Sequence, residues 1–489
     1  MADSPNLVFI FSDRQRYDTL AAYGNDWIRT PNLNKLANQS LVFDHCYVTQ
    51  PVCAPARSSI MTGLYPHSAQ MPTNKLIMPP DIQTIAGMVS NDYQKAYYGK
   101  WHLGDEIIKQ RGFNEWESVM DRLWAEYSSE DYIGTFSSYR DFLVENGFEP
   151  DMDIPGGKIF SDEYRAELPA EYQQSTFLGN KAGQFIRDNS NQPYVLYVSM
   201  LEPHPPFTGP YNDIYDSATL PTDPTFMQPP DGHSLFSRKR SEYFMNSEFD
   251  GHDLSKEAGW RQLRSNYMAN ITLVDDAVGN ILKAIDESGQ SDNTIVVFTS
   301  EHGDLVGSHG MLEMRTFYEA ASKVPLLIRV PWLQNQSARI PGNFSQIDLL
   351  PTLLDLMGQD QPEHLQGESR VDVLEGKSSL QDNDVFIQHN GIGDRDLTSE
   401  ESKPTASKAL KDDINYLNTL PWRSIVSHDR WKLNLCVGDQ CELFDLNSDP
   451  FEFNNLFNLP EHKDRIRAMG ARIRLWQHRT GDNAPLPSL

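Results

Sequence analysis

The chain has 489 residues, of which 39% are hydrophobic, and a formal net charge of −26. This length exceeds what one hydrophobic core usually serves, so we expect two domains. The acidic balance argues against nucleic acid as a general partner, although a local basic pocket can still bind a small anion. No stretch approaches the roughly 18 consecutive apolar residues of a membrane-spanning helix, so we expect no membrane span.

The N-terminal residues Met-Ala-Asp-Ser-Pro lead almost directly into an apolar run, without the succession of basic, apolar and small residues that forms a secretory signal. We therefore expect either a cytoplasmic protein or a periplasmic or secreted protein whose leader has been removed.

Four short apolar runs, rich in Val, Ile and Tyr, are each followed at once by polar side chains; they cover residues 7–11, 95–98, 194–200 and 294–299. Such runs are typical of buried strands. A helical apolar pattern over residues 271–285 ends at Gly289. The alternation of strands and helices predicts an α/β fold with a large, mostly parallel sheet flanked by helices.

In open α/β sheets, functional sites form beyond the carboxyl ends of the strands. We therefore expect the polar side chains that follow the four runs to lie close together, although they span nearly 300 positions. They are Asp13 after the first run, Lys100 and His102 after the second, His204 after the third, and Glu301 and His302 after the fourth.

The pattern changes after about residue 375. Short strand-like segments follow at 384–388, 423–427, 431–437 and 441–446, and a basic amphipathic helix lies near 462–478. We expect a catalytic domain over residues 1–375 and a smaller α+β domain on an antiparallel sheet over residues 376–489.

Four cysteines are too few for a disulfide scaffold. Cys436 and Cys441 flank Gly438-Asp439. A two-residue hairpin turn there would make the cysteines cross-strand neighbours, so a disulfide and two free thiols are both open.

Cys53 stands in the segment Cys-Ala-Pro-Ala-Arg, two residues before Pro55 and four before Arg57. Proline is tolerated in the first turn of a helix, so this spacing puts Cys53 at a helix N-terminus, where main-chain N–H groups attract anions. Arg57 lies one turn further on. The segment thus predicts a nucleophile beside an anion site, and a buried structural cysteine is the alternative.

The segment CAPARSSIMTG resembles the sulfatase signature Cys-x-Pro-Ser/Ala-Arg. Three further segments resemble the same family: GKWHLG at 99–104, EPHPPF at 202–207 and NTIVVFTSEHGDLVGSHGM at 293–311. The resemblance implies an alkaline-phosphatase-like fold and the hydrolysis of sulfate esters through a formylglycine, made from Cys53 by a maturation enzyme. The residues implied to act on the sulfate are Cys53, Arg57, Lys100, His102 and His204.

The resemblance also implies a divalent metal held by Asp13, Cys53, Glu301 and His302. The family metal is usually calcium, and a histidine ligand with fewer carboxylates would also tolerate manganese. In the implied mechanism, a hydroxyl of the hydrated aldehyde attacks sulfur and His204 protonates the departing alcohol. His102 then takes a proton from the second hydroxyl, which expels sulfate.

Two positions depart from the family pattern. Arg14 stands where a second metal ligand is usual, and a guanidinium cannot ligate a cation. It must point away from the metal or reach the substrate sulfate, or else the metal is absent or weak. Met314 stands where the family usually has a lysine. We expect Arg14 to replace that lysine as a sulfate ligand.

The insertion over residues 205–262 contains Arg238-Lys239-Arg240 near aromatic residues. Long excursions of this kind are often lids or binding loops. Cations beside aromatic faces suit a sulfated sugar, so we expect Arg238 and Arg240 to bind substrate, together with Arg14, Lys100 and His204. A solvated basic turn is the alternative.

The resulting hypothesis is a carbohydrate sulfatase. One alternative is a phosphonate monoester or phosphodiester hydrolase on the same scaffold. A second alternative is a non-catalytic protein that binds sulfated glycans.

Overall fold

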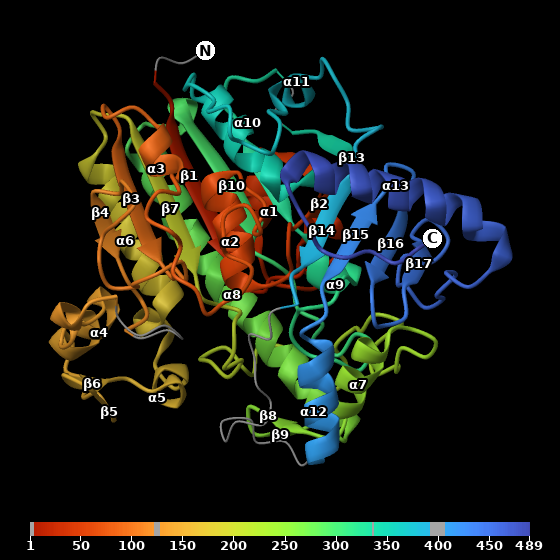
Figure 1. Cartoon of the computed structure of the whole chain (residues 1–489). Helices are drawn as coiled ribbons and strands as arrows, with labels where there is room; N and C mark the ends of the chain where they lie inside the picture. The colour runs from red at the N-terminus through yellow and green to blue at the C-terminus, as the bar shows by residue number, and fades with distance from the viewer. Residues whose placement is uncertain (1–3, 122–127, 335–336, 392–405) are drawn as a thin grey trace.

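The computed structural model describes residues 4–121, 128–334, 337–391 and 406–489 (Figure 1). One large sheet of nine strands organises this part of the chain. Its order is β11 (Lys323–Val324), β2 (Leu41–Tyr47), β12 (Leu326–Arg329), β10 (Thr294–Ser300), β1 (Asn6–Ser12), β7 (Tyr194–Met200), β3 (Gln94–Gly99) and β4 (Glu115–Glu117), with β13 (Arg339–Ser345) also paired to β2.

The centre of this sheet is parallel. β1 pairs in parallel with β10 and β7, β3 pairs in parallel with β7 and β4, and β13 does so with β2. Only β11 and β12 run antiparallel to their neighbours. Every residue of β1, β7 and β10 is buried, because helices cover both faces of the sheet. The predicted α/β fold class is confirmed.

Alternate residues of β1 face opposite sides of the sheet and enter two separate cores. Leu7, Phe9 and Phe11 join the core beneath α2 (Cys53–Thr62) and α10 (Leu349–Leu356). Val8 and Ile10 join the core beneath α1 (Pro31–Ala37), α6 (Gln174–Asp188) and α8 (Glu257–Glu287). The sheet is therefore the middle layer of three, as Figure 1 shows.

Smaller elements decorate this frame. They are the helices α3 (Ile85–Met88), α4 (Ser138–Glu145), α5 (Asp162–Ala166), α7 (Leu235–Phe244), α9 (Glu319–Ser322), α11 (Val371–Leu374) and α12 (Lys408–Leu417), and the strand pairs β5 (Met152–Ile154) with β6 (Gly157–Ile159) and β8 (Glu248–Phe249) with β9 (His252–Asp253). α7 and α12 pack against each other at the lower edge of Figure 1.

A second sheet of four antiparallel strands follows in the C-terminal part. It contains β14 (Val385–His389), β15 (Trp422–Val426), β16 (Trp431–Cys436) and β17 (Glu442–Asp445). Ile466, Met469 and Ile473 of α13 (Lys463–Thr480) pack on one face of it. These elements match the predicted strands and helix, whereas the domain boundary at residues 375/376 stays a prediction.

The strand register decides the question of the two cysteines. Asn434 pairs with Glu442 in the β16–β17 hairpin, so continuing the register sets Leu435 opposite Cys441. Neighbouring residues of a strand point to opposite faces. Accordingly, Cys436 packs in the core facing α7, and Cys441 packs in the core beneath α13. Both thiols are free, and their opposed directions rule out the disulfide.

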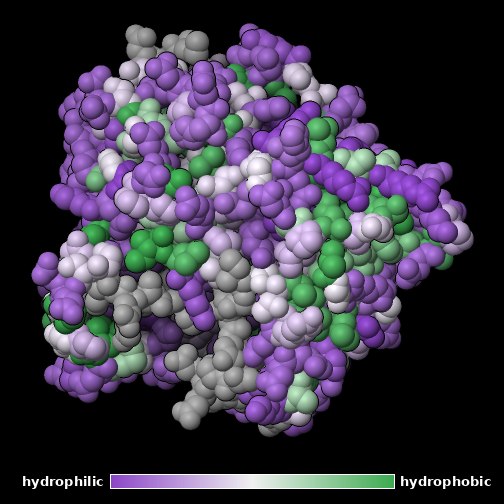
Figure 2. All heavy atoms as spheres, in the orientation of Figure 1, coloured by the Kyte–Doolittle hydropathy of each residue, from purple (hydrophilic) through white to green (hydrophobic). Residues whose placement is uncertain are grey.

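The face of the molecule in Figure 2 is mostly hydrophilic, with hydrophobic side chains gathered on its right side, over the C-terminal sheet. Among the helices of the described ranges, none has the length and apolar character required to cross a lipid bilayer.

Candidate active site

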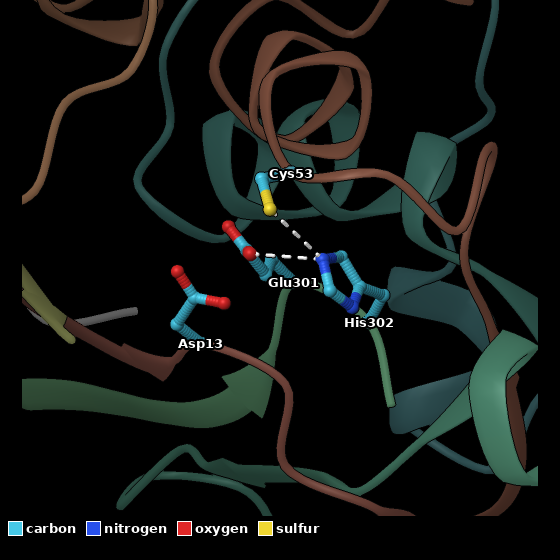
Figure 3. Close-up of side chains that lie close together, drawn as sticks. All are labelled: Asp13, Cys53, Glu301 and His302. Atoms are coloured by element: carbon cyan, nitrogen blue, oxygen red, sulfur yellow. Dashed lines mark hydrogen bonds and ion pairs between the residues drawn. The ribbon is translucent and has the colours of Figure 1, made fainter. Parts of the chain in front are cut away.

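Four predicted site residues converge where β1 and β10 end and α2 begins. Each of Asp13, Cys53, Glu301 and His302 contributes one ligand atom to a group in which all atoms lie within 4.8 Å of one another. Figure 3 shows Cys53 reaching in from α2 and Asp13 from the opposite side. All four residues are buried. Asp13, Glu301 and His302, which follow two of the four predicted strands, therefore lie together beside Cys53.

Cys53 is the first residue of α2 and is 2% exposed. The main-chain N–H of Ala54 donates to Asn74 Oδ1 at 3.0 Å, so a distant loop caps this helix N-terminus. His302 Nε2 lies 3.2 Å from Cys53 Sγ and 3.0 Å from Glu301 Oε1. Burial opposes charge on the imidazole, but Cys53 and Glu301 outweigh it and raise the pKa of His302 to about 10.

Glycine is required where the loop after β3 turns into the site. Gly99 has φ +112°, and a Cβ there would lie 1.9 Å from the carbonyl oxygen of Ser199. This close approach of β3 to β7 directs the next residue, Lys100, toward Asp13.

Two cations balance the two buried carboxylates. Lys100 Nζ lies 2.5 Å from Asp13 Oδ2, while the Arg57 guanidinium pairs with Glu301 and lies 3.5 Å from Asp13. Arg57 also donates to the Lys100 carbonyl at 2.6 Å and to Ser199 Oγ at 2.7 Å. Burial opposes ionisation of Asp13, but Lys100 together with its other polar and charged neighbours outweighs burial and holds the pKa of Asp13 well below its usual range. Lys100 and Arg57 are thus fixed beside the nucleophile.

The carboxylates have oxygen atoms to spare for a cation. Asp13 Oδ1 and both oxygens of Glu301 are buried, and apart from the ion pairs of Glu301 with Arg57 and His302 they have no hydrogen-bond partner among the described residues. Buried acceptors with so few partners are costly, and a hard divalent cation would satisfy them. The predicted ligand set therefore fits a metal.

Arg14 lies at the edge of the metal cluster, with its Nε 4.0 Å from Asp13 Oδ1. Its guanidinium lies between Asp304 Oδ2, at 3.2 Å, and His204 Nε2, at 3.4 Å. His204 Nδ1 faces the carbonyl oxygen of Pro205 at 2.7 Å, which places a proton on Nδ1 and the lone pair on Nε2. Burial and then the Arg14 charge hold the pKa of His204 well below its usual range.

His102 is buried in a left-handed backbone conformation, with φ +58°. Neither ring nitrogen has a hydrogen-bond partner among the described residues. Burial and then Lys100 lower the pKa of His102, so the ring is a neutral base.

The structure places Arg240 at a buried position on α7. This side chain is 3% exposed and donates to the carbonyl oxygens of Met314, at 2.5 Å, and Leu312, at 3.0 Å. Its guanidinium also lies 5.5 Å from the Phe236 ring. The same guanidinium lies 3.6 Å from Glu313 Oε2, and these contacts connect α7 to the loop around Met314. The substrate role of Arg240 stays a prediction. Arg238 is exposed on α7, and its substrate role stays a prediction.

At position 314, where the resembled family usually has a lysine, neither Met314 nor the neighbouring Arg315 takes over its role. Met314 is 1% exposed and packs in an apolar core, while Arg315 Nη1 lies 3.4 Å from Glu313 Oε2. Arg14 lies beside His204. If Arg14 replaces the family lysine as a sulfate ligand, it must lie at this place.

Sequence reasoning missed Asp304, Ser199 and Asn74, which hold Arg14, Arg57 and the α2 N-terminus. Asp304 had a signal, since it lies two residues after His302 on the loop at the end of β10. Ser199 ends in the site because it is the next-to-last residue of β7. Nothing in the sequence near Asn74 indicates its role.

Comparison with known proteins adds an independent observation. The family model described as Sulfatase matches residues 5–359. The chain belongs to the sulfatase family. The matched span includes every residue of the metal cluster together with Arg57, Lys100, His102 and His204, so the signatures and the geometry agree.

Individual similarities in this family are distant but cover nearly the whole chain. This sulfatase-family chain is 26% identical to the multifunctional alkaline phosphatase superfamily protein PehA of Trinickia caryophylli, over 96% of this chain and 95% of that protein. It is 23% identical to N-acetylglucosamine-6-O-sulfatase of Bacteroides thetaiotaomicron, over 98% and 88%. Among solved structures, phosphonate monoester hydrolase SpPMH from Silicibacter pomeroyi matches with a TM-score of 0.78 and 22% identity, over 98% and 96%.

Proposed function

We propose that this protein hydrolyses a sulfate ester of a carbohydrate, with Cys53 converted to formylglycine as the nucleophile. The observation that carries the proposal is the position of Cys53. Its side chain lies at a helix N-terminus and within 4.8 Å of the other candidate metal ligands. Lys100 and Arg57 pair with the carboxylates of the same cluster.

The hydrated aldehyde of formylglycine would supply one hydroxyl for attack on sulfur and a second for release of sulfate. A maturation enzyme is required as a partner, because the conversion is an oxidation of Cys53. Asp13, Glu301, His302 and residue 53 would hold the metal, which we propose to be calcium, with manganese as the alternative. When bound, the cation supplies positive charge that polarises the ester.

The side chains divide the remaining work. Lys100 and Arg57 neutralise the sulfate oxygens, since both are held beside Asp13 at the nucleophile. His102, a buried neutral base whose ring nitrogens have no hydrogen-bond partner in the described part of the chain, accepts the proton that accompanies sulfate release.

Arg14 and His204 act together at the leaving oxygen in this proposal. Arg14, fixed by Asp304, adds a sulfate ligand where the family lysine is replaced by Met314. The negative charge of a bound sulfate offsets the effect of the positive Arg14 on the imidazole, so His204 takes up a proton from solvent at Nε2 and delivers it to the departing alcohol.

The carbohydrate part of the proposal rests on the relatives. One relative is named an N-acetylglucosamine-6-O-sulfatase and another an ulvan-active sulfatase. Within this chain, Arg240 is buried on α7 with its guanidinium near the rings of Phe236 and Phe244, and its contact with a sugar remains part of the proposal.

A phosphonate monoester hydrolase is the second candidate. The solved phosphonate monoester hydrolase from Silicibacter pomeroyi matches over nearly the whole of both chains. The departures at Arg14 and Met314 alter the anion site itself, which is where a preference for phosphorus over sulfur would arise.

The two candidates are separated by one substrate panel. Protein co-expressed with a formylglycine-generating enzyme is assayed with N-acetylglucosamine 6-sulfate, an aryl sulfate and an aryl phosphonate monoester. The proposal predicts the highest kcat/KM for the sulfated sugar. A highest kcat/KM for the phosphonate favours the second candidate, and tight binding of the sulfated sugar without turnover favours a non-catalytic protein.

A further inference from the structure

Glu106 is a buried carboxylate that the proposed mechanism does not use. It lies four residues after His102 and is 3% exposed. Its Oε2 accepts the main-chain N–H of Trp101 at 2.7 Å, and its Oε1 accepts the main-chain N–H of His102 at 2.8 Å. One carboxylate thus binds two successive N–H groups of the loop that carries Lys100 and His102.

The backbone of His102 needs such a support. Its φ of +58° lies in the left-handed region, which is sparsely populated by residues other than glycine. Residues persist in that region where the surrounding structure holds them, and they cluster at active sites. The ring of His102 has no partner among the described residues that would hold it, so the support comes through the main chain.

The main chain of Glu106 is itself fixed by a hydrogen bond. The indole N–H of Trp116, on β4, donates to the Glu106 carbonyl oxygen at 2.8 Å. Trp116 and Trp101 belong to one aromatic group, with ring centroids 5.4 Å apart. Glu106 therefore links the packed aromatic group at the edge of the sheet, through its main-chain carbonyl, to the loop that enters the active site, through its carboxylate.

We propose that Glu106 is a positioning residue that fixes His102 in its catalytic orientation by binding the N–H groups of Trp101 and His102. The inference rests on the proposed function for the role of His102 in turnover. Both carboxylate oxygens are needed, because each accepts one N–H. Glutamine keeps the shape of the side chain but sets an NH2 group against one of the two donors.

The test is a double-mutant cycle on the matured enzyme. Glu106→Gln is expected to lower kcat on the sulfate ester by about 10- to 100-fold, with KM changed less than about threefold, because Lys100 and Arg57 still bind the sulfate. In a His102→Ala background, the same substitution is expected to change kcat less than about twofold. Asp105→Asn is the matched control, because the neighbouring Asp105 carboxylate binds Ser128 outside the site and its loss is expected to leave kcat unchanged.

Three results would overturn the proposal. One is an equal loss of kcat with and without His102. Another is a raised KM with unchanged kcat. The third is failure of both Glu106→Gln and Glu106→Asp to fold, which would make Glu106 a general stability residue.

A crystal structure of Glu106→Gln separates this inference from the proposed function. The φ of His102 is expected to leave the left-handed region, and an unchanged φ would contradict the proposal. That result does not depend on turnover. If the wild-type enzyme turns over no sulfate ester, the proposed function fails while the structure of the variant still decides the role of Glu106.

Discussion

Nε2 of His302 lies 3.2 Å from Sγ of Cys53, although 249 positions separate the two residues in the chain. The contact exists because β10 ends beside β1 in a parallel pair, and α2 packs its N-terminus over that edge. A cysteine at this point is surrounded by candidate metal ligands and cations, which is the arrangement expected of a reactive residue.

Removing the nucleophile tests the role of this contact. Cys53→Ala is expected to lower kcat on a sulfate ester by at least about 10³-fold, because no other group in the cluster can form the covalent intermediate. Cys441→Ala is the control, since Cys441 is a free thiol beneath α13. Comparable losses in the two variants would show that Cys53 has no special role.

The charge of Arg14 is expected to act on the anion. Arg14→Gln should lower kcat/KM for a sulfate ester by about 10²-fold, the size of effect seen when one charge donor to a transition state is lost. Arg14→Lys should fall between, because a single ammonium cannot reach both Asp304 and His204 as the guanidinium does. A structure with bound sulfate in which Arg14 stays on Asp304 and His204 and does not contact the anion would contradict this role.

Metal removal should affect stability as well as activity. With the cation gone, two oxygens of Glu301 and one of Asp13 lose their proposed partner. Calcium at 100 times its Kd is then expected to raise the free energy of unfolding of the chelated protein by about 2.7 kcal/mol. Differential scanning calorimetry measures the shift, and Glu301→Gln should reduce it. Equal shifts in the wild type and the variant would place the calcium elsewhere.

Two arginines on α7 should behave differently. Arg240→Ala is expected to lower the free energy of unfolding by about 3 kcal/mol, because it leaves the carbonyls of Leu312 and Met314 buried without that donor. Arg238→Ala should change it by less than about 0.5 kcal/mol and, if Arg238 binds substrate, raise KM for a sulfated oligosaccharide. Urea unfolding and steady-state kinetics measure both. An unchanged KM for Arg238→Ala would remove it from the substrate site.

His309 should make stability depend on pH. Its ring stacks on Tyr318 with centroids 4.0 Å apart, and burial lowers its pKa to about 3. Between pH 6.5 and pH 3 the unfolded chain binds a proton that the folded protein excludes, so this residue costs about 1.4 kcal/mol of stability per pH unit of acidification.

His309→Asn tests this, because asparagine tolerates the left-handed φ of +54° at this position. On going from pH 6.5 to pH 5, the free energy of unfolding of the variant should fall less steeply than that of the wild type. The difference in slope should be about 1.4 kcal/mol per pH unit, the value for one bound proton. His478→Asn, at an exposed position on α13, serves as the control. Parallel pH profiles for the wild type and His309→Asn would contradict the assignment.

The sequence predicted where the buried strands end, but it did not predict which contacts the loops make. The predicted strand at 194–200 coincides with β7, because a run buried on both faces is apolar throughout. Strand order then brings the residues after each run together, which is why the metal cluster could be anticipated from Asp13, Glu301 and His302.

Arg240 shows what the sequence does not determine. Its basic neighbours indicated a surface, yet Phe236, Arg240 and Phe244 recur every four residues and share one face of α7, which the core covers. Whether that face meets solvent or the loop around Met314 depends on tertiary packing, which spacing along the helix does not reveal. The same limit applies to Glu106, whose partners are main-chain N–H groups and leave no pattern in the sequence.

The most direct test of the account is the mass of the tryptic peptide spanning residues 36–57, taken from enzyme that is turning over a sulfate ester. The peptide contains both Cys46 and Cys53, so Cys46 is an internal control. The account predicts the mass loss of a thiol-to-aldehyde conversion, located at position 53 by fragmentation, with Cys46 unchanged. Two intact thiols in the active enzyme would contradict it.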